Sequence, residues 1–207
     1  MVLAIALMSA WSVMADKGEL VTVELTDGTS KEYELHGGLY NKMTGMPLSK
    51  LTFTDYGGSN KQQIDLKNIQ SITWGGENGE RWVCAYYYGY NFVGTNAVDK
   101  LSKKKKLFKE IYAGKNIRLY WDKEVNSGTG IVRDIYYFQR NGEEVTYVTN
   151  TARGAVAGTE LFTKTLLNYF TEKDFAERIE AGEFRPEKIK DVTIDYMIDI
   201  ARAYDQR

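Results

Sequence analysis

Residues 19–36 read ELVTVELTDGTSKEYELH, and this stretch indicates the class of fold. Apolar residues alternate with polar ones on both sides of Asp27-Gly28, as is typical of strands with one buried face. The alternating apolar residues are Val21, Val23, Leu25, Tyr33 and Leu35. An Asp-Gly pair between two such runs is a strong signal for a tight turn. The stretch therefore predicts an antiparallel β-hairpin.

More short strands follow the hairpin. Residues 51–55 (LTFTD) form another apolar run, and further apolar positions continue as far as Trp74. Four or five short strands in about 60 residues indicate a small curled sheet or open barrel. We therefore expect a small β unit at residues 16–79. Residues 80–207 are expected to form an antiparallel sheet with C-terminal helices, either as a second unit or continuous with the first.

Residues 81–93 (RWVCAYYYGYNFV) predict one long strand with an aromatic face. The residues on that face are Trp82, Cys84, Tyr86, Tyr88, Tyr90 and Phe92. Apolar stripes on the later helices need a sheet to cover, which favours a core with Trp82, Tyr86 and Phe92 buried beneath those helices. The alternative is an exposed surface on which Tyr86, Tyr88 and Tyr90 stack against sugars.

The next segment changes period. Residues 100–112 have apolar residues at helical spacing with lysines between them, and Gly114 follows as a C-terminal cap. A helix is therefore expected there. Residues 116–121 return to alternation, and a second hairpin is expected from residues 131–139 and 144–149 around Asn141-Gly142.

The C-terminal tail is expected to be helical. Residues 159–170 carry a wide apolar stripe, and Phe175 and Ile179 lie one turn apart in a helix that Gly182 ends. A last helix is expected at 187–204, with Pro186 at its start. Strands first and helices last is the pattern of an α+β fold.

Residues 1–15 read MVLAIALMSAWSVMA, without a charge. The run is shorter than a membrane span, and Val13-Met14-Ala15 has the small-x-small form of a signal-peptidase site. We therefore expect a signal peptide cleaved after Ala15, the alternative being a buried first strand or helix. With one cysteine and no glycosylation sequon, the chain fits the periplasm or cell surface of a bacterium. No transmembrane segment is expected in the mature chain.

Three stretches resemble sequences of uncharacterised exported bacterial proteins. They are KLFKEIYAGKNIRLY, which ends at Tyr120, YYFQRNGEEVTYV at 136–148, and LLNYFTEKDFAERIEAGEF at 166–184. The resemblance covers about half of the chain. It implies a signal peptide, a strand-rich body and a short helical tail, and it implies no activity and no site.

The amino-acid composition limits the kinds of ligand and of site that are expected. The 27 basic and 28 acidic side chains give a net charge of −1, so no global field attracts nucleic acid. A single histidine, His36, and a single cysteine, Cys84, exclude sites that need two or more of either residue. We expect no metal and no cofactor.

A catalytic site is not expected. His36 lies between polar neighbours on one strand face with Glu32 and Glu34, so it is expected to be a solvated hairpin residue. Cys84 lies in the aromatic strand and is expected to be buried and inert. A pair of carboxylates acting in hydrolysis stays open as an alternative, since no sequence spacing specifies or excludes it.

Lys103–Lys106 is the sharpest charge feature. Residues 99–118 hold eight basic and two acidic side chains, a net charge of +6. The run is either a solvated helix face or a site for an anionic partner.

The most favoured function is that of a non-catalytic envelope protein that binds or scaffolds another envelope protein. The alternative is a module that binds a glycan or an anionic membrane surface through Lys103, Lys104, Lys105, Lys106, Tyr86, Tyr88 and Tyr90.

Overall fold

The computed structural model of the protein describes residues 18–39, 48–75, 79–90, 97–125, 132–152 and 159–207. The expected signal peptide at residues 1–15 lies outside these residues, and so does Phe92. The described part of the chain folds as one mostly antiparallel sheet followed by helices, so the α+β prediction is confirmed.

The sheet contains twelve strands in the described residues. They are β1 (Glu19–Leu25), β2 (Ser30–His36), β3 (Lys50–Asp55), β4 (Lys61–Asp65), β5 (Ile69–Trp74), β6 (Arg81–Ala85), β7 (Tyr87–Tyr90), β8 (Ala97–Leu101), β9 (Lys106–Ala113), β10 (Ile117–Val125), β11 (Val132–Arg140) and β12 (Val145–Ala152). Their order across the sheet is β4-β3-β2-β1-β5-β6-β9-β10-β11-β12-β7-β8, and among these described strands only β12 and β7 pair in parallel.

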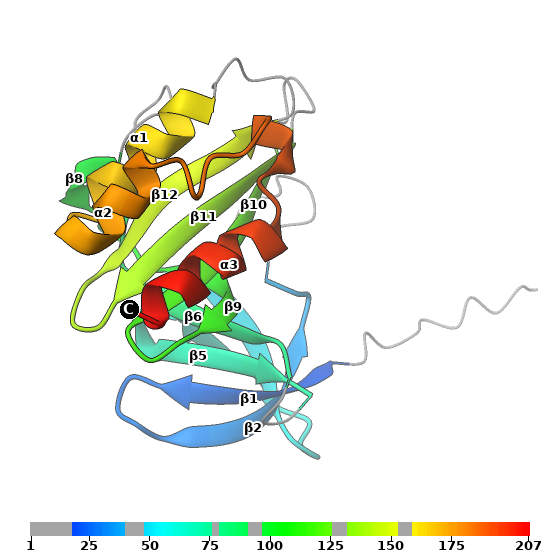
Figure 1. Ribbon diagram of the computed structural model, residues 1–207. Helices are drawn as coiled ribbons and strands as arrows, with labels where there is room; N and C mark the ends of the chain where they lie inside the picture. The colour runs from blue at the N-terminus through cyan, green and yellow to red at the C-terminus, as the bar shows by residue number, and fades with distance from the viewer. Residues whose placement is uncertain (1–17, 40–47, 76–78, 91–96, 126–131, 153–158) are drawn as a thin grey trace, which may run out of the picture.

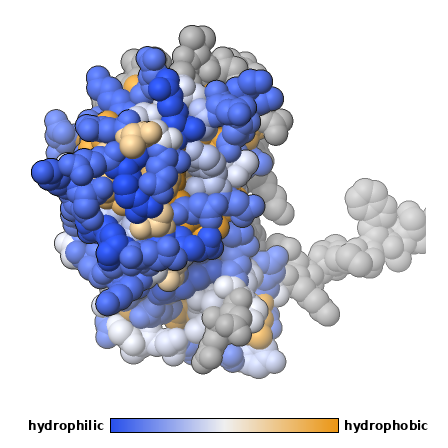
Figure 2. Space-filling view, viewed as in Figure 1, coloured by the Kyte–Doolittle hydropathy of each residue, from blue (hydrophilic) through white to orange (hydrophobic). Residues whose placement is uncertain are grey.

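The C-terminal helices cover one face of this sheet. They are α1 (Thr159–Tyr169), α2 (Lys173–Glu180) and α3 (Ile194–Asp205), with short 3-10 turns η1 (Leu66–Asn68) and η2 (Ile189–Asp191) elsewhere. Figure 1 shows the helices in front of β10, β11 and β12, with β1, β2 and β5 at the opposite end of the molecule. Figure 2 shows that the outer surface of this helical face is largely hydrophilic, as expected where the apolar side of each helix faces the sheet.

Both expected hairpins are present. β1 pairs with β2 across Asp27-Gly28, and β11 pairs with β12 across Asn141-Gly142. Gly28 and Gly142 have φ values of +84° and +79°, a region that glycine enters without steric cost. Local turn chemistry therefore determines these two connections.

The first core lies inside the N-terminal part of the sheet. It contains Val21, Val23, Tyr33, Leu35, Leu39, Leu51, Phe53, Leu66, Ile69, Ile72, Trp82, Cys84 and Leu107. Apart from Leu39, which follows β2, these residues come from β1, β2, β3 and β5, from the 3-10 turn η1, and from β6 and β9. The alternating apolar residues of the first hairpin thus face this core as expected.

The expected single strand at 81–93 is two strands, because regular pairing stops at Tyr86. β6 pairs with β5 and β9, whereas β7 pairs with β12 and β8. Trp82 is buried, but in the N-terminal core and not beneath the helices, and Tyr86 is 37% exposed. The expectation that Trp82 and Tyr86 lie under the helices is therefore wrong.

The expected helix at 100–112 is also wrong, because this segment forms parts of β8 and β9. β9 pairs with β6 along one edge and with β10 along the other, and both of its faces carry buried side chains. The Leu107 side chain lies in the first core, whereas the Phe108 side chain lies in a different core on the other face of β9. Two residues that are adjacent in sequence are therefore both apolar. A register shift opposite Leu119/Tyr120 then interrupts strict alternation. Together these features imitate helical spacing.

Gly114 is not a helix cap but part of the β9–β10 connection. A Cβ at this position would lie 1.7 Å from the Asp205 carboxylate, so glycine lets the end of α3 approach closely. Asp205 accepts hydrogen bonds from the backbone N–H groups of Lys115 (2.8 Å) and Asn116 (2.7 Å) and from the Tyr112 hydroxyl (2.9 Å). Asp205 therefore fastens α3 to the sheet.

Asp205 should make stability depend on acid pH. Desolvation acts to raise its pKa, but the hydrogen bonds from Asn116, Tyr112 and Lys115 outweigh it and hold the pKa below its usual value. A lowered folded-state pKa means that this stabilisation is present above the unfolded pKa and is lost as pH falls through the folded pKa. We expect Asp205→Ala to cost about 2 kcal/mol at pH 7, with a smaller difference from wild type below about pH 4. Urea unfolding at both pH values measures this, and a difference that grows in acid would contradict it.

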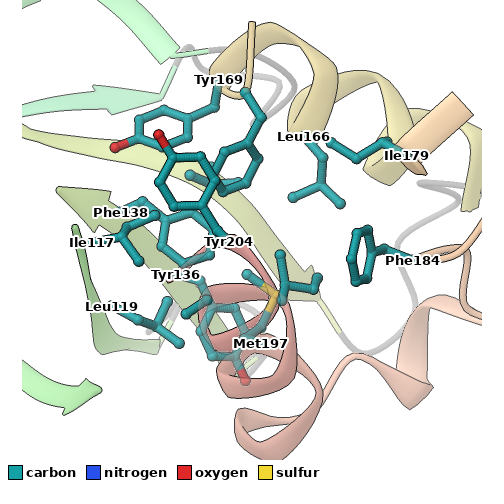
Figure 3. Close-up of a cluster of buried hydrophobic side chains, with 14 of the residues drawn as sticks. Ile117, Leu119, Tyr136, Phe138, Leu166, Tyr169, Ile179, Phe184, Met197 and Tyr204 are labelled. Atoms are coloured by element: carbon teal, nitrogen blue, oxygen red, sulfur yellow. The ribbon is translucent and has the colours of Figure 1, made fainter. Parts of the chain in front are cut away.

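The second core lies between the helices and the sheet (Figure 3). Leu119 and Phe138 point from the strands toward Leu166 on α1 and Met197 on α3. The expected helix at 159–170 is confirmed by α1, and Gly182 follows α2 with a φ of +87°.

The last helix begins later than expected. α3 starts at Ile194 because Thr193 provides its N-cap, with the Thr193 hydroxyl accepting from the Tyr196 N–H. Pro186 precedes η2 and is buried, and it does not begin a helix.

The third core lies on the opposite side of β9–β12 from the helices. Phe108, Tyr120, Ile135, Tyr137, Val145 and Tyr147 are its buried residues. Tyr87 and Tyr90 from β7 pack against them, as do Val83 and Ala85 from β6. Because β6 and β7 are separated only by Tyr86, the chain brings together two positions that are distant in sheet order, and the sheet wraps around this aromatic interior.

Candidate anion-binding cleft

A cleft of about 780 Å³ opens beside the third core. Its lining comes from four segments: the entry to β3, the end of β4 with η1, the β6–β7 junction, and the β8–β9 turn with the start of β9. The lining residues are Leu48, Ser49, Asp65, Leu66, Lys67, Tyr86, Tyr87, Lys103, Lys104, Lys105 and Lys106. Five lysines and one carboxylate therefore share one concave surface.

The lysine turn is held in place by Ser102. Its backbone N–H donates to the Tyr87 carbonyl at 2.9 Å, and its hydroxyl accepts from the Tyr87 N–H at 3.0 Å. This pair of hydrogen bonds fixes the start of the turn against the β6–β7 junction. Lys103, Lys104 and Lys105 therefore cross the short distance to β9 along the wall of the cleft.

Two of the lysines are held by the protein itself. The Lys106 ammonium pairs with Asp122, whose residue is 1% exposed, and lies 5.9 Å from the ring centroid of Tyr87. The Lys105 ammonium donates to the Ile69 carbonyl at 3.3 Å. Lys106 thus forms part of the cleft floor, and Lys105 spans from one wall toward β5.

Lys103, Lys104 and Lys67 are exposed, and no ion pair joins them to any other residue in the described part of the chain. Among the described lining residues Asp65 is the single acidic one, and its Oδ1 accepts from the Lys67 N–H at 3.0 Å to cap η1. Because, within the described residues, these three lysines form no ion pair and the lining holds one carboxylate, the cleft has a positive potential. A concave site focuses such a potential on an incoming anion.

Tyr86 lies in the same cleft and carries a cation beside its ring. The Lys105 ammonium is 5.9 Å from the ring centroid, within the range of a cation–π contact. The pairing break between β6 and β7 leaves Tyr86 on neither core, which explains its exposure. The structure therefore places Tyr86 with Lys103–Lys106.

Tyr88 and Tyr90 lie elsewhere. Tyr90 packs against the third core and donates to the Glu124 carboxylate; burial and this hydrogen bond raise its pKa above the usual value. Tyr88 lines a separate groove of about 450 Å³ beside Tyr169, together with Arg140, Glu143 and Glu144. This second groove contains one arginine and two glutamates, so it is a weaker candidate for binding an anion than the lysine cleft.

His36 and Cys84 are both engaged in the fold. His36 is half-buried, and its Nε2 lies 2.8 Å from the Thr54 hydroxyl on β3, so it is not the solvated residue expected. The Cys84 thiol is buried and donates to the Leu66 carbonyl at 3.2 Å. Desolvation raises the thiol pKa to about 12, which disfavours the thiolate and agrees with an inert cysteine.

Sequence reasoning missed Lys67, Asp65 and Tyr87 as parts of the cleft. The Asp65–Lys67 turn is 36 or more residues from the lysine run, and no local pattern links the two. In one continuous strand Tyr87 would face the opposite side from Tyr86, so it was not part of the expected aromatic face.

No family model, curated protein or solved structure matches this chain. Among the described residues, no helix has the length and apolar character needed to cross a membrane. The same residues contain no group of three or more histidine, cysteine or acidic side chains arranged to hold a metal ion.

Proposed function

We propose that the protein is an exported, non-catalytic binding protein of the bacterial envelope, and that it holds a soluble anionic ligand in the lysine cleft. The observation that carries this proposal is the gathering of five lysines against one carboxylate in a concave site of about 780 Å³. That volume is in the range of small-ligand sites. A flat membrane surface or a folded partner would reach fewer of these lysines than a ligand that enters the cleft.

Export is supported by the uncharged apolar run at residues 1–15 and by the resemblance to exported bacterial proteins. A binding role without catalysis is supported by the surroundings of the histidine and the cysteine. His36 contacts Thr54, and Cys84 is buried with a raised pKa, so neither is presented to a ligand in the cleft. Lysines with intact charges bind anions without any chemical step.

The proposal predicts that Lys103 and Lys104 contribute directly to binding. We expect Lys103→Ala/Lys104→Ala to weaken binding of a carboxylate oligomer about tenfold, from the loss of up to about 1 kcal/mol for each exposed charge pair. Both side chains are exposed, so the melting temperature should stay within about 2 °C of wild type. Titration calorimetry with trigalacturonate and with triglutamate, at low salt, measures the affinity.

A matched control has the same net charge. Lys164 on α1 and Lys173 on α2 are exposed and lie outside the cleft, so Lys164→Ala/Lys173→Ala should bind as wild type does. About 1 M salt, where the Debye length is about 3 Å, should remove most of the binding. Equal weakening in both double variants, or no binding of either oligomer to wild type, would overturn the proposal.

A further inference from the structure

We infer that the ligand of the lysine cleft is an acidic sugar, which stacks one ring face on Tyr86 while its anionic group lies among the lysines. This inference rests on the proposed function and names its ligand class. Three features of the lining carry it: an exposed aromatic ring, a mixed apolar and polar wall, and a carboxylate placed among cations.

Tyr86 provides the stacking surface. Its ring lines the cleft, it is 37% exposed, and Lys105 lies 5.9 Å from the ring centroid. Tyrosine rings pack well against flat groups that are apolar on their face and polar at their edge. The C–H face of a sugar ring has this character, whereas a simple carboxylate or a phosphate chain does not. A cation beside the ring then places an acidic substituent next to the stacked sugar.

The lining contributed by the entry to β3 and by the end of β4 with η1 is mixed in character. Leu48 and Leu66 line the cleft beside Ser49 and Asp65. Such a wall accepts the apolar and hydroxyl-bearing sides of a sugar together. Leu48 is partly exposed, and a ligand consisting only of charge would leave its apolar surface without a complementary group.

Asp65 distinguishes a sugar from a plain polyanion. Its Oδ1 accepts from the Lys67 N–H, and its carboxylate lies in the cleft among the lysines. A carboxylate repels a second anion but accepts a hydrogen bond from a hydroxyl group. An acidic sugar supplies both groups that this cleft requires, an anion for the lysines and hydroxyls for Asp65.

The test compares two probes with equal charge. Trigalacturonate and triglutamate each carry three side-chain or ring carboxylates, but only the first has sugar rings; the triglutamate is capped at both ends. We expect wild type to bind trigalacturonate at least about fivefold more tightly, a ratio that corresponds to one aromatic contact. Tyr86→Ala should reduce this preference to near one, and Tyr86→Phe should keep most of it.

Two controls make the outcomes distinct. Tyr56 is exposed outside the cleft, so Tyr56→Ala should leave the preference unchanged. Thermal melting of each variant checks that the fold is retained.

Binding of both probes with equal affinity would overturn the acidic-sugar inference but leave the proposed function standing. Failure of both probes to bind wild type would overturn the proposed function itself. A sugar preference that survives in folded Tyr86→Ala would overturn the role of Tyr86 and with it this inference.

Discussion

Replacing Phe170 with alanine is expected to lower the free energy of unfolding by about 3–5 kcal/mol, the usual cost of truncating a buried phenylalanine. Phe170 is 0% exposed and follows the end of α1. Its ring centroid lies 4.8–5.2 Å from those of four other aromatic rings, which belong to Phe138, Tyr169, Phe175 and Tyr204. One side chain therefore joins the sheet to all three helices.

Urea unfolding followed by circular dichroism measures this loss. Tyr56→Ala is the control, because Tyr56 is 64% exposed and should change stability by no more than about 0.5 kcal/mol. Phe170→Leu should retain part of the stability, since leucine fills part of the space. A Phe170→Ala variant within about 1 kcal/mol of wild type would contradict the packing of the helices on the sheet.

Lys106→Met is expected to cost about 3–5 kcal/mol, because it removes a cation from beside a carboxylate that is almost completely buried. Asp122 is 1% exposed, and the Lys106 ammonium pairs with it at the floor of the cleft. Asp122→Asn should cost less, because Lys106 lines the cleft and its ammonium can turn toward water there.

The double variant Lys106→Met/Asp122→Leu separates a charge effect from a packing effect. Removing both charges avoids a buried carboxylate without its lysine, so the double variant should be more stable than Lys106→Met. The free energies of unfolding of Lys106→Met, of Asp122→Leu and of the double variant complete the cycle. A double variant whose loss equals the sum of the two single losses would contradict coupling between these side chains.

Turn chemistry made much of the fold predictable. The strands beside Asp27-Gly28 and Asn141-Gly142 lie as expected, because each turn needs only its own residues to adopt its conformation. The helical tail was also predictable. The apolar residues of α1 repeat at helical spacing along one face of the helix while the other face is exposed, and this pattern indicates a helix. These elements are determined by neighbours in sequence.

The central strands were less predictable, because tertiary contacts decide them. β9 is covered on both faces and carries Leu107 and Phe108 toward different cores, so its pattern suits a helix as well as a strand. The chain also changes partners at Tyr86, which no residue type marks. The lysine run was visible in the sequence, but Lys67 and Asp65 reach it only through the fold.

The most direct test of the lysine cleft as a binding site is the position of a bound acidic sugar. Titrating trigalacturonate into isotope-labelled protein while recording amide NMR spectra reports that position residue by residue. We predict saturable shifts concentrated at Asp65–Lys67, Tyr86–Tyr87 and Ser102–Lys106, the segments that line or position the cleft. Shifts confined to the groove around Tyr88 and Arg140, or no shifts up to millimolar ligand, would contradict the account.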